Sequence, residues 1–289
     1  MPASVWKDDA ARLRLEHWYE RFLARVPGPV ERRQVPTRHG QSHVLVAGRA
    51  DGPVVVALHP MRAGAAHLLS ELGPLLAHYR VVAPDLPDQS VRGLQLRLPL
   101  ADDALARWLL DVLDGLELRT VNLFGVSWGG FVARLTASTA PERVRRLALL
   151  VPAGVANGSH VTGLMKMAVP MIRWRLRPSD ANLRRVLDPL FTTWDREWSD
   201  YVAGTLRDMP MDLRIPPLAS DDALRRLTMP VLVLGGAEDI SFPGDAVVRR
   251  VTAMAPHADG ELIPGCKHSP PATEEFREWL AARLRRFLE

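Results

Sequence analysis

The 289-residue chain is poor in cysteine, in lysine and in long apolar runs. Cys266 is the only cysteine, which excludes an intramolecular disulfide and a cysteine-based metal cluster. No stretch approaches the ~18 consecutive apolar residues of a membrane-spanning helix, and the charged N-terminus lacks the apolar core of a signal peptide. We therefore expect a cytoplasmic protein with no membrane partner.

Lysine occurs only at Lys7, Lys166 and Lys267, so arginine supplies almost all of the positive charge. The formal net charge is only +4, and the arginines are scattered along the chain. Because a nucleic-acid-binding protein would carry a basic stripe with interleaved aromatic residues, we expect no nucleic-acid partner. With 47% hydrophobic and 24% charged residues, the composition is typical of an ordinary globular protein.

Apolar runs that suit buried strands alternate with helical spacing over most of the chain. The predicted strands span residues 31–37, 42–46, 54–58, 80–83, 121–124, 144–151, 229–235 and 259–263, and the predicted helices span residues 7–26, 65–78, 100–115, 131–139, 221–227, 244–255 and 273–288. Continuous β-branched runs such as residues 54–58 are typical of strands buried on both faces. The pattern predicts an α/β fold with a mostly parallel central sheet flanked by helices.

Residues 153–219 interrupt this alternation, because they hold helical stretches rich in Met and Trp and no strand-like run. We expect this segment to be a helical cap inserted into the core. The core is then divided into an N-terminal part, residues 1–152, and a C-terminal part, residues 220–289. Met and Trp suit adaptable apolar binding surfaces, so Met165 and Trp194 are candidates for lining a substrate pocket.

One short motif points to a candidate nucleophile. Residues 125–129 read Gly-Val-Ser-Trp-Gly, between a short apolar strand and an apolar helical pattern. This is the G-x-S-x-G arrangement of a nucleophile elbow, with Ser127 at its apex. A serine in such a sharp turn has a strained backbone, and glycines on both sides let strand and helix approach closely. A pentapeptide can also match by chance, so its context has to decide.

Polar side chains of complementary chemistry follow two later strands. Glu238 and Asp239 come after the next-to-last predicted strand, and His268 comes after the last. A serine hydroxyl needs a base within hydrogen-bond reach, and that imidazole needs an acid that fixes its tautomer. Because the carboxyl ends of parallel strands share one edge of a sheet, we expect Ser127, His268 and an acid to meet there. Asp239 is the preferred acid, with Glu238 as the alternative.

The order serine, acid, histidine, each just past a strand, resembles the α/β-hydrolase fold superfamily over nearly the whole chain. Within that superfamily the chain resembles bacterial carboxylesterase-like members with a helical cap. The resemblance implies that Ser127 is the nucleophile, that Asp239 in the G-x-x-D segment 236–239 is the acid, and that His268 in the G-x-x-H-S segment 265–269 is the base. It also implies a small-molecule substrate.

The resemblance further implies an oxyanion hole made of two backbone N–H groups, one of them from Trp128. The other comes from the loop after the first buried strand, where His59-Pro60 stands in place of the usual His-Gly. Proline has no N–H, so Met61 is the expected second donor. We expect His59 to brace this loop, and Arg62 either to face solvent or to bind an anionic group. Both are candidate substrate-binding residues.

No His, Asp or Glu cluster has metal-ligand spacing, and Gly235-Gly236 lacks the spacing of a dinucleotide-binding loop. We therefore expect no metal and no cofactor. The oligomeric state stays open.

Together these features predict hydrolysis of a small to medium, fairly apolar carboxylic ester through an acyl-enzyme on Ser127. A fold does not fix a reaction, so lactone, thioester or carbon–carbon hydrolysis, iminopeptidase cleavage, and a cyclisation or acyl transfer in biosynthesis stay open. Pro60 leaves a non-catalytic ligand-binding protein open, and a structural or interaction protein with a degenerate site is the last alternative. Dehalogenase and epoxide hydrolase chemistry is disfavoured, because it needs a carboxylate at position 127.

Overall fold

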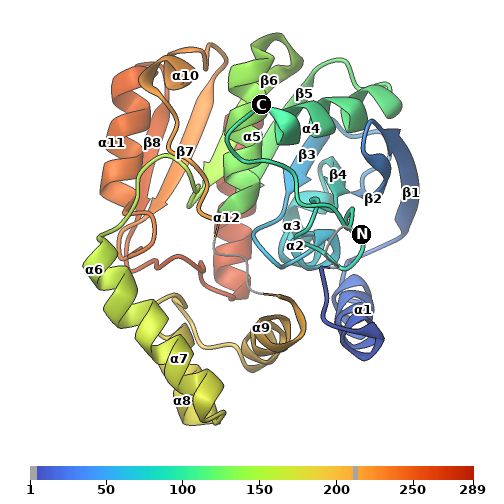
Figure 1. The fold of residues 1–289 in the computed structure, drawn as a ribbon. Coiled ribbons are helices and arrows are strands. Elements are labelled where there is room, and N and C mark those ends of the chain that lie inside the picture. Colours follow the sequence, from blue (N-terminus) through green and yellow to red (C-terminus); the bar gives the residue numbers. More distant parts are fainter. Residues whose placement is uncertain (1–4, 211–213) are drawn as a thin grey trace.

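Eight strands form one mixed sheet in the computed structural model, which describes residues 5–210 and 214–289 (Figure 1). The strands are β1 (Val30–Thr37), β2 (Gly40–Gly48), β3 (Val54–Leu58), β4 (Arg80–Pro84), β5 (Val121–Val126), β6 (Val144–Leu150), β7 (Val231–Gly236) and β8 (Asp259–Ile263). They lie in the order β1-β2-β4-β3-β5-β6-β7-β8. All neighbours from β4 to β8 are parallel, and β2 is antiparallel to both β1 and β4. The predicted mostly parallel sheet is confirmed.

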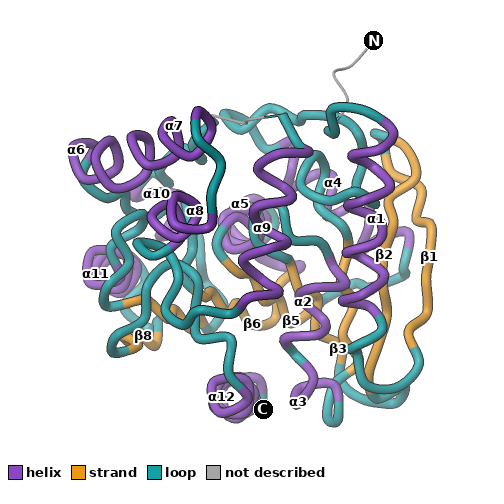
Figure 2. The backbone as a smooth tube through the Cα atoms, turned by 90° about the horizontal axis from the view of Figure 1, so that it is seen from below, coloured by secondary structure: helices purple, strands orange, loops and turns teal. Residues whose placement is uncertain are grey.

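Helices cover both faces of this sheet (Figure 2). One face is covered by α4 (Ala104–Gly115), α5 (Trp128–Thr139), α10 (Asp221–Arg225) and α11 (Gly244–Met254), and the other by α1 (Asp9–Leu23), α2 (Ala65–Glu71), α3 (Gly73–Leu76) and α12 (Glu274–Leu288). Each face has its own apolar layer, with Trp108 and Phe131 fully buried in one and Leu69 and Leu284 in the other. The apolar runs predicted as strands are buried between these layers, which explains why they show no alternation.

Several helix predictions need correction. The helix predicted at residues 7–26 spans only Asp9–Leu23, and the one predicted at residues 100–115 begins at Ala104. Residues 65–78 form two helices rather than one, and α3 begins at Gly73-Pro74. A proline inside a helix lacks the N–H and collides with the carbonyl four residues earlier, whereas the first turn tolerates it. The helix predicted at residues 131–139 begins earlier, at Trp128, directly after Ser127.

A 3-10 turn (Pro141–Arg143) precedes β6, and the other helices lie in the segment 153–219 between β6 and β7, here called the insertion. These are α6 (His160–Gly163), a π-helical turn (Leu164–Ala168), α7 (Val169–Leu176), α8 (Asp180–Leu187) and α9 (Arg196–Asp208). None of its described residues belongs to the sheet. In Figure 1 these helices lie below the sheet, with α6, α7 and α8 beneath the β8 side and α9 beside α1. A bidentate ion pair between Arg14 of α1 and Asp208 of α9 joins these two helices.

Candidate active site

Ser127 occupies the sharp turn between β5 and α5. Its backbone has φ 51° and ψ −111°, a conformation that residues with a side chain rarely adopt. A Cβ atom at Gly125 would collide with the carbonyl of Gly129, and one at Gly129 would collide with the carbonyl of Leu58. Both glycines are therefore required by the close approach of β3, β5 and α5, and the strained turn is held by packing on every side.

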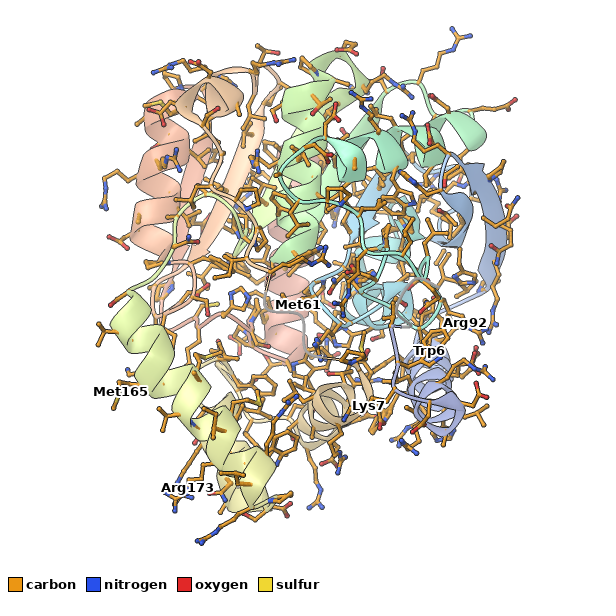
Figure 3. All side chains as sticks on the ribbon, in the orientation of Figure 1. Trp6, Lys7, Met61, Arg92, Met165 and Arg173 are labelled. Atoms are coloured by element: carbon orange, nitrogen blue, oxygen red, sulfur yellow. The ribbon has the colours of Figure 1, made fainter. Side chains whose placement is uncertain are left out.

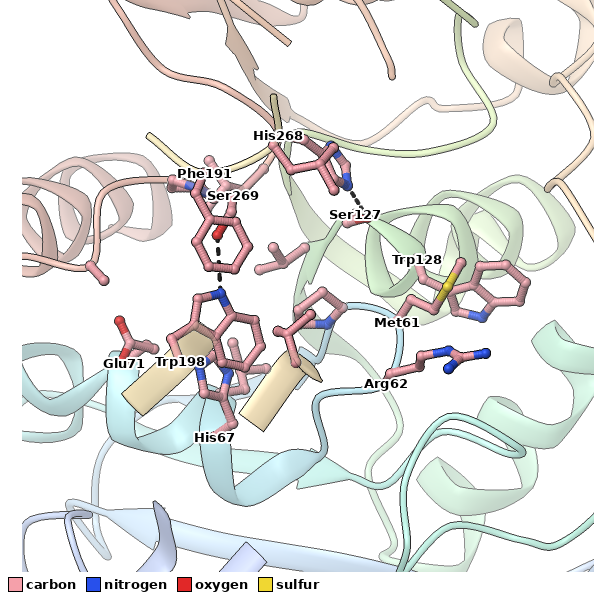
Figure 4. Close-up of a pocket in the computed structure, with 18 of the residues that line it drawn as sticks. Met61, Arg62, His67, Glu71, Ser127, Trp128, Phe191, Trp198, His268 and Ser269 are labelled. Atoms are coloured by element: carbon pink, nitrogen blue, oxygen red, sulfur yellow. Dashed lines mark hydrogen bonds between the residues drawn. The ribbon is translucent and has the colours of Figure 1, made fainter. Parts of the chain in front are cut away.

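A chain of hydrogen bonds joins Ser127, His268 and Asp239, the three residues that the sequence pattern predicts to meet. Ser127 Oγ lies 2.9 Å from His268 Nε2, and His268 Nδ1 lies 2.8 Å from Asp239 Oδ2 (Figure 4). An ionised carboxylate only accepts hydrogen bonds, so Nδ1 carries the proton that is donated to Asp239. The lone pair of Nε2 then faces the serine hydroxyl.

Asp239 is itself held in place. Its side chain is buried, and its second oxygen accepts hydrogen bonds from the backbone N–H groups of Ser241 (2.7 Å) and Phe242 (3.0 Å). Glu238, the alternative acid, is exposed and lies on the outer side of the same turn. The structure thus places Asp239, rather than Glu238, against His268.

Cys266, two residues before His268, is fully buried. Burial raises the pKa of its thiol to about 11, and its Sγ donates to the carbonyl of Lys267. The thiol stays protonated at neutral pH and is a poor nucleophile.

His59 lies beneath the loop that follows β3 and is fully buried. Its Nε2 accepts from the N–H of Leu86 (2.9 Å), so in the neutral ring Nδ1 is the donor to the carbonyl of Pro60 (2.8 Å). Burial lowers the pKa of His59, which keeps the ring neutral. His59 therefore braces the loop, and it is not among the described residues that line the cavity.

The two predicted oxyanion donors lie on the same side of Ser127. Figure 4 shows Met61 and Trp128 beside the serine. Trp128 is the first residue of α5, where an N–H has no partner within the helix. Among the described residues, the N–H of Met61 has no protein acceptor either. Both amides are thus available to an oxygen atom bound next to Ser127.

The side chain of Arg62 neither faces solvent nor waits for an anionic group; it hydrogen-bonds within the protein. Its guanidinium donates to the carbonyls of Thr205 (3.1 Å) and Pro210 (2.8 Å), at the end of α9, although its side chain also lines the cavity. In return, the hydroxyl of Tyr201 on α9 lies 2.6 Å from the carbonyl oxygen of Arg62 and 2.7 Å from that of Ala63. The loop after β3 is therefore tied to α9 in both directions.

A second contact joins the insertion to the loop of His268. The N–H of Thr192 and its hydroxyl both donate to the carbonyl of Ser269 (3.1 and 2.7 Å), and the Thr192 hydroxyl accepts from the N–H of Lys267 (2.8 Å). Trp198 adds a hydrogen bond from Nε1 to Ser269 Oγ (3.3 Å, Figure 4). The two neighbours of His268 in the chain are thus both held by Thr192.

These residues surround a cavity of about 400 Å³ with a mostly apolar lining. Ser127, His268, Met61 and Trp128 line one end of it. At the other end Arg277 and Glu71 form a bidentate ion pair (3.0 Å for both contacts). Between them, the ring of His67 stacks on Trp198 with ring centroids 4.0 Å apart, and burial lowers the pKa of His67 to about 4.

Two other predicted pocket residues lie elsewhere among the described residues. Met165 is 60% exposed on the outside of the insertion, and Met167, two residues later, lines the cavity instead. Trp194 packs on Phe191, with the guanidinium of Arg184 4.3 Å from the centre of its ring. The sequence prediction also missed the walls from α1 and α12, Phe22, Phe276 and Leu280. Their only signal is apolar character, which does not distinguish a cavity wall from a core.

Within the described residues, no group of three or more His, Cys, Asp or Glu side chains is arranged to hold a metal ion. In the same residues, no helix is long and apolar enough to cross a membrane.

Comparison with known proteins agrees with this geometry. Residues 53–275, which contain β3 to β8, match the model of the alpha/beta hydrolase fold family. The chain is 24% identical over 265 residues to the uncharacterized carboxylesterase nap of Bacillus subtilis (strain 168), which covers 89% of this chain and 86% of that protein. It is 30% identical over 210 residues to a 2-hydroxymuconate semialdehyde hydrolase of Pseudomonas putida (65% and 70%).

The crystal structure of naproxen esterase (carboxylesterase NP) from Bacillus subtilis superposes with a TM-score of 0.83 at 21% identity, covering 98% of this chain and all of that one. That likeness confirms the fold. The resemblance inferred from the order of serine, acid and histidine is confirmed by the family match, and the chain belongs to the α/β-hydrolase fold family of hydrolytic enzymes.

Proposed function

We propose that this protein is a serine carboxylesterase in which Ser127, His268 and Asp239 carry the reaction. The observation behind the proposal is the hydrogen-bond chain from Ser127 Oγ through His268 to Asp239, with contacts of 2.9 and 2.8 Å, at the end of an apolar cavity. Relatives from Bacillus subtilis that are named carboxylesterases support the choice of an ester bond.

In the first half of the proposed reaction, Ser127 Oγ attacks the ester carbonyl carbon while its proton passes to His268 Nε2. Asp239 stabilises the imidazolium that forms and keeps its orientation. The carbonyl π electrons move to oxygen, and the N–H groups of Met61 and Trp128 stabilise this oxyanion. When the tetrahedral intermediate collapses, the bond to the alkoxy oxygen breaks and His268 gives its proton to the leaving alcohol.

In the second half, a water molecule attacks the acyl-enzyme. His268 takes a proton from the water, a second tetrahedral intermediate forms at the same oxyanion site, and its collapse returns the proton to Ser127 Oγ. The products are a carboxylic acid and an alcohol. Every proton is carried by His268, so the step needs no group beyond the residues named.

The substrate we propose is a small to medium, fairly apolar ester. A cavity of about 400 Å³ lies within the range of small-molecule sites, and most of its lining is apolar. The two oxyanion donors are backbone amides, which serve any acyl group. The choice among esters therefore falls to the walls, chiefly Phe191, Trp198 and Phe276. The cytoplasmic location remains a sequence prediction.

The test is burst kinetics with p-nitrophenyl acetate, butyrate and octanoate. The wild-type protein should release one equivalent of p-nitrophenol per site before a slower steady state, as acylation precedes deacylation. Ser127→Ala should lower kcat by at least about 10⁴-fold. Ser241→Ala, which changes another serine of the same cavity, is the matched control and should keep the burst. Equal turnover by wild type and Ser127→Ala would favour the non-catalytic binding protein.

A second candidate is carbon–carbon hydrolysis by the same three residues. It is favoured by one observation, the similarity to a 2-hydroxymuconate semialdehyde hydrolase. Incubation with that semialdehyde and detection of its two cleavage products separates the two candidates. Turnover of the semialdehyde at a higher kcat/KM than any ester would replace the first proposal by the second.

A further inference from the structure

Five large apolar side chains form an exposed stripe along the helical run from α6 to α7. They are Val161, Met165, Val169, Ile172 and Leu176, and they are between 47% and 77% exposed. Their spacing of four, four, three and four residues is that of one helix face. They make up five of the eleven large hydrophobic side chains that are exposed in the described residues. The opposite face packs inward through Trp174, which is buried against α8.

Positive charge gathers around this stripe. Residues 160–187 contain six basic side chains and a single acidic one, Asp180, so their net charge of +5 leaves the rest of the chain close to neutral. Lys166, Arg173, Arg175 and Arg177 are exposed on the same run. Figure 3 shows Met165 and Arg173 on the outer side of this run, away from the sheet. The stripe is thus an apolar face flanked by cations, with no acidic side chain between residues 160 and 179.

We propose that the run α6–α7 is an interfacial helix that docks on an anionic lipid surface. A helix that lies in the membrane interface buries an apolar face at the headgroup boundary and places Lys and Arg near the lipid phosphates. A second copy of the chain fits the stripe less well, because its own cations would face those of the first copy. The expectation of no membrane partner rested on the absence of a spanning helix, which says nothing about a helix lying on the surface.

The same run reaches the cavity. Met167, in the π-helical turn, lines the cavity that contains Ser127, whereas Met165 belongs to the exposed stripe. Docking therefore brings the cavity wall next to the lipid surface, where apolar esters dissolve. This delivery of substrate rests on the proposed function, but the docking itself does not.

The experiment is flotation of the full-length protein with vesicles of phosphatidylglycerol and phosphatidylcholine in equal parts, and with vesicles of phosphatidylcholine alone. The wild type should float with the anionic vesicles, less in high salt, and at least about tenfold less with the neutral ones. The double variant Ile172→Ser/Leu176→Ser should lose at least about tenfold in lipid affinity. The triple variant Arg173→Gln/Arg175→Gln/Arg177→Gln should lose at least as much, since each cation near the surface contributes about a factor of five.

Two controls separate this proposal from its rivals. The double variant Leu13→Ser/Leu262→Ser removes exposed apolar side chains elsewhere on the surface. This variant and Ser127→Ala should both float as the wild type does. Docking is overturned if the wild type stays with the aqueous fraction, or if Ile172→Ser/Leu176→Ser floats unchanged. It is also overturned if sedimentation velocity shows a dimer that this double variant dissociates, since the stripe is then an interface between copies. Failure of ester turnover with normal flotation contradicts only the proposed function.

Discussion

The inner and outer parts of the insertion relate to the core in opposite ways. The inner part, residues 190–208, hydrogen-bonds to the loops on both sides of Ser127, through Thr192 to the loop of His268 and through Tyr201 to the loop of Met61. The outer part, residues 160–176, exposes its apolar stripe and contributes Met167 to the cavity. The inner part of the insertion thus holds the two loops beside Ser127 in position, whereas the outer part presents an apolar stripe to the surroundings.

Packing supports the same division. Tyr201 is buried in a cluster of aromatic rings, with ring centroids 5.1 Å from Phe22, 5.3 Å from Trp198 and 5.9 Å from Trp18. Displacing the inner part would expose this cluster and break the ion pair between Arg14 and Asp208. The inner part is therefore fixed to α1 as well as to the loops of Met61 and His268, which makes its independent opening costly.

Among variants of the inner part, Tyr201→Phe is expected to lower turnover the most. The variant keeps the buried ring but loses the hydroxyl that binds the carbonyls of Arg62 and Ala63. The N–H of Met61 then loses its fixed position, and a displaced oxyanion donor acts on the transition state rather than on substrate binding. We expect kcat for p-nitrophenyl butyrate to fall about tenfold, with KM within about twofold.

The matched control for this variant is Tyr79→Phe, a buried tyrosine just before β4 that does not line the cavity. It should leave kcat unchanged. Equal losses in both variants, or a Tyr201→Phe effect seen only in KM, would show that Tyr201 has no role in placing the loop.

A smaller effect is expected from Thr192→Val, which keeps the side-chain shape and removes the hydroxyl bonded to Lys267 and Ser269. The imidazole of His268 should become less well oriented, and kcat should fall about fivefold. Thr136→Val serves as the control, because that hydroxyl bonds within α5 only. An unchanged kcat together with an unchanged pH–rate profile would show that the frame does not extend to His268.

The pH dependence of stability tests the packing of the inner part against His67 without any measurement of activity. Burial against Trp198 and Phe22 lowers the pKa of His67 to about 4, below its ordinary value of about 6.5. Between these values the unfolded chain binds a proton that the folded chain does not, so the free energy of unfolding falls as pH falls from 6.5 to 4. Urea denaturation of His67→Phe should show a weaker loss over this window. His17→Gln, at an exposed position, should behave as the wild type does, and equal slopes in all three proteins would refute the prediction.

The smallest effect is expected in the outer part. Ile172→Ser/Leu176→Ser removes two exposed side chains and should change the free energy of unfolding by less than about 1 kcal/mol. Leu187→Ala, which empties a fully buried position in α8, should lose about 2–4 kcal/mol. Turnover of a soluble ester should stay within about twofold in the double variant. A large loss of stability or of turnover would mean that the outer run also belongs to the frame.

Much of the core could be predicted because its strands are buried on both faces. A continuous β-branched run such as residues 54–58 favours a central strand, and β3 has the predicted ends, whereas β5 extends two residues past the predicted 121–124. The ends of helices were less predictable, since the break at Gly73-Pro74 depends on one proline. The π-helical turn at residues 164–168 has no sequence signal that we recognise.

At the site, the meeting of Ser127, Asp239 and His268 was predictable because the strand order fixes where their loops lie. The cavity walls were not. Helical spacing indicates which residues share a face, but it does not say what that face contacts, so Met165 was chosen where Met167 lines the cavity. The hydrogen bonds of Arg62 to the end of α9 join residues more than 140 positions apart in the chain. A contact this distant in sequence leaves no local pattern from which it could be predicted.

The proposed reaction requires Ser127 to be an activated nucleophile. Labelling of the full-length protein with a fluorophosphonate, followed by peptide mass spectrometry, measures this without knowledge of the natural substrate. We predict a single adduct on Ser127, formed at least about a hundredfold more slowly in His268→Ala, because the base that takes the serine proton is gone. An unlabelled protein, or an adduct on Ser241 or Ser269, which line the same cavity, would contradict the account.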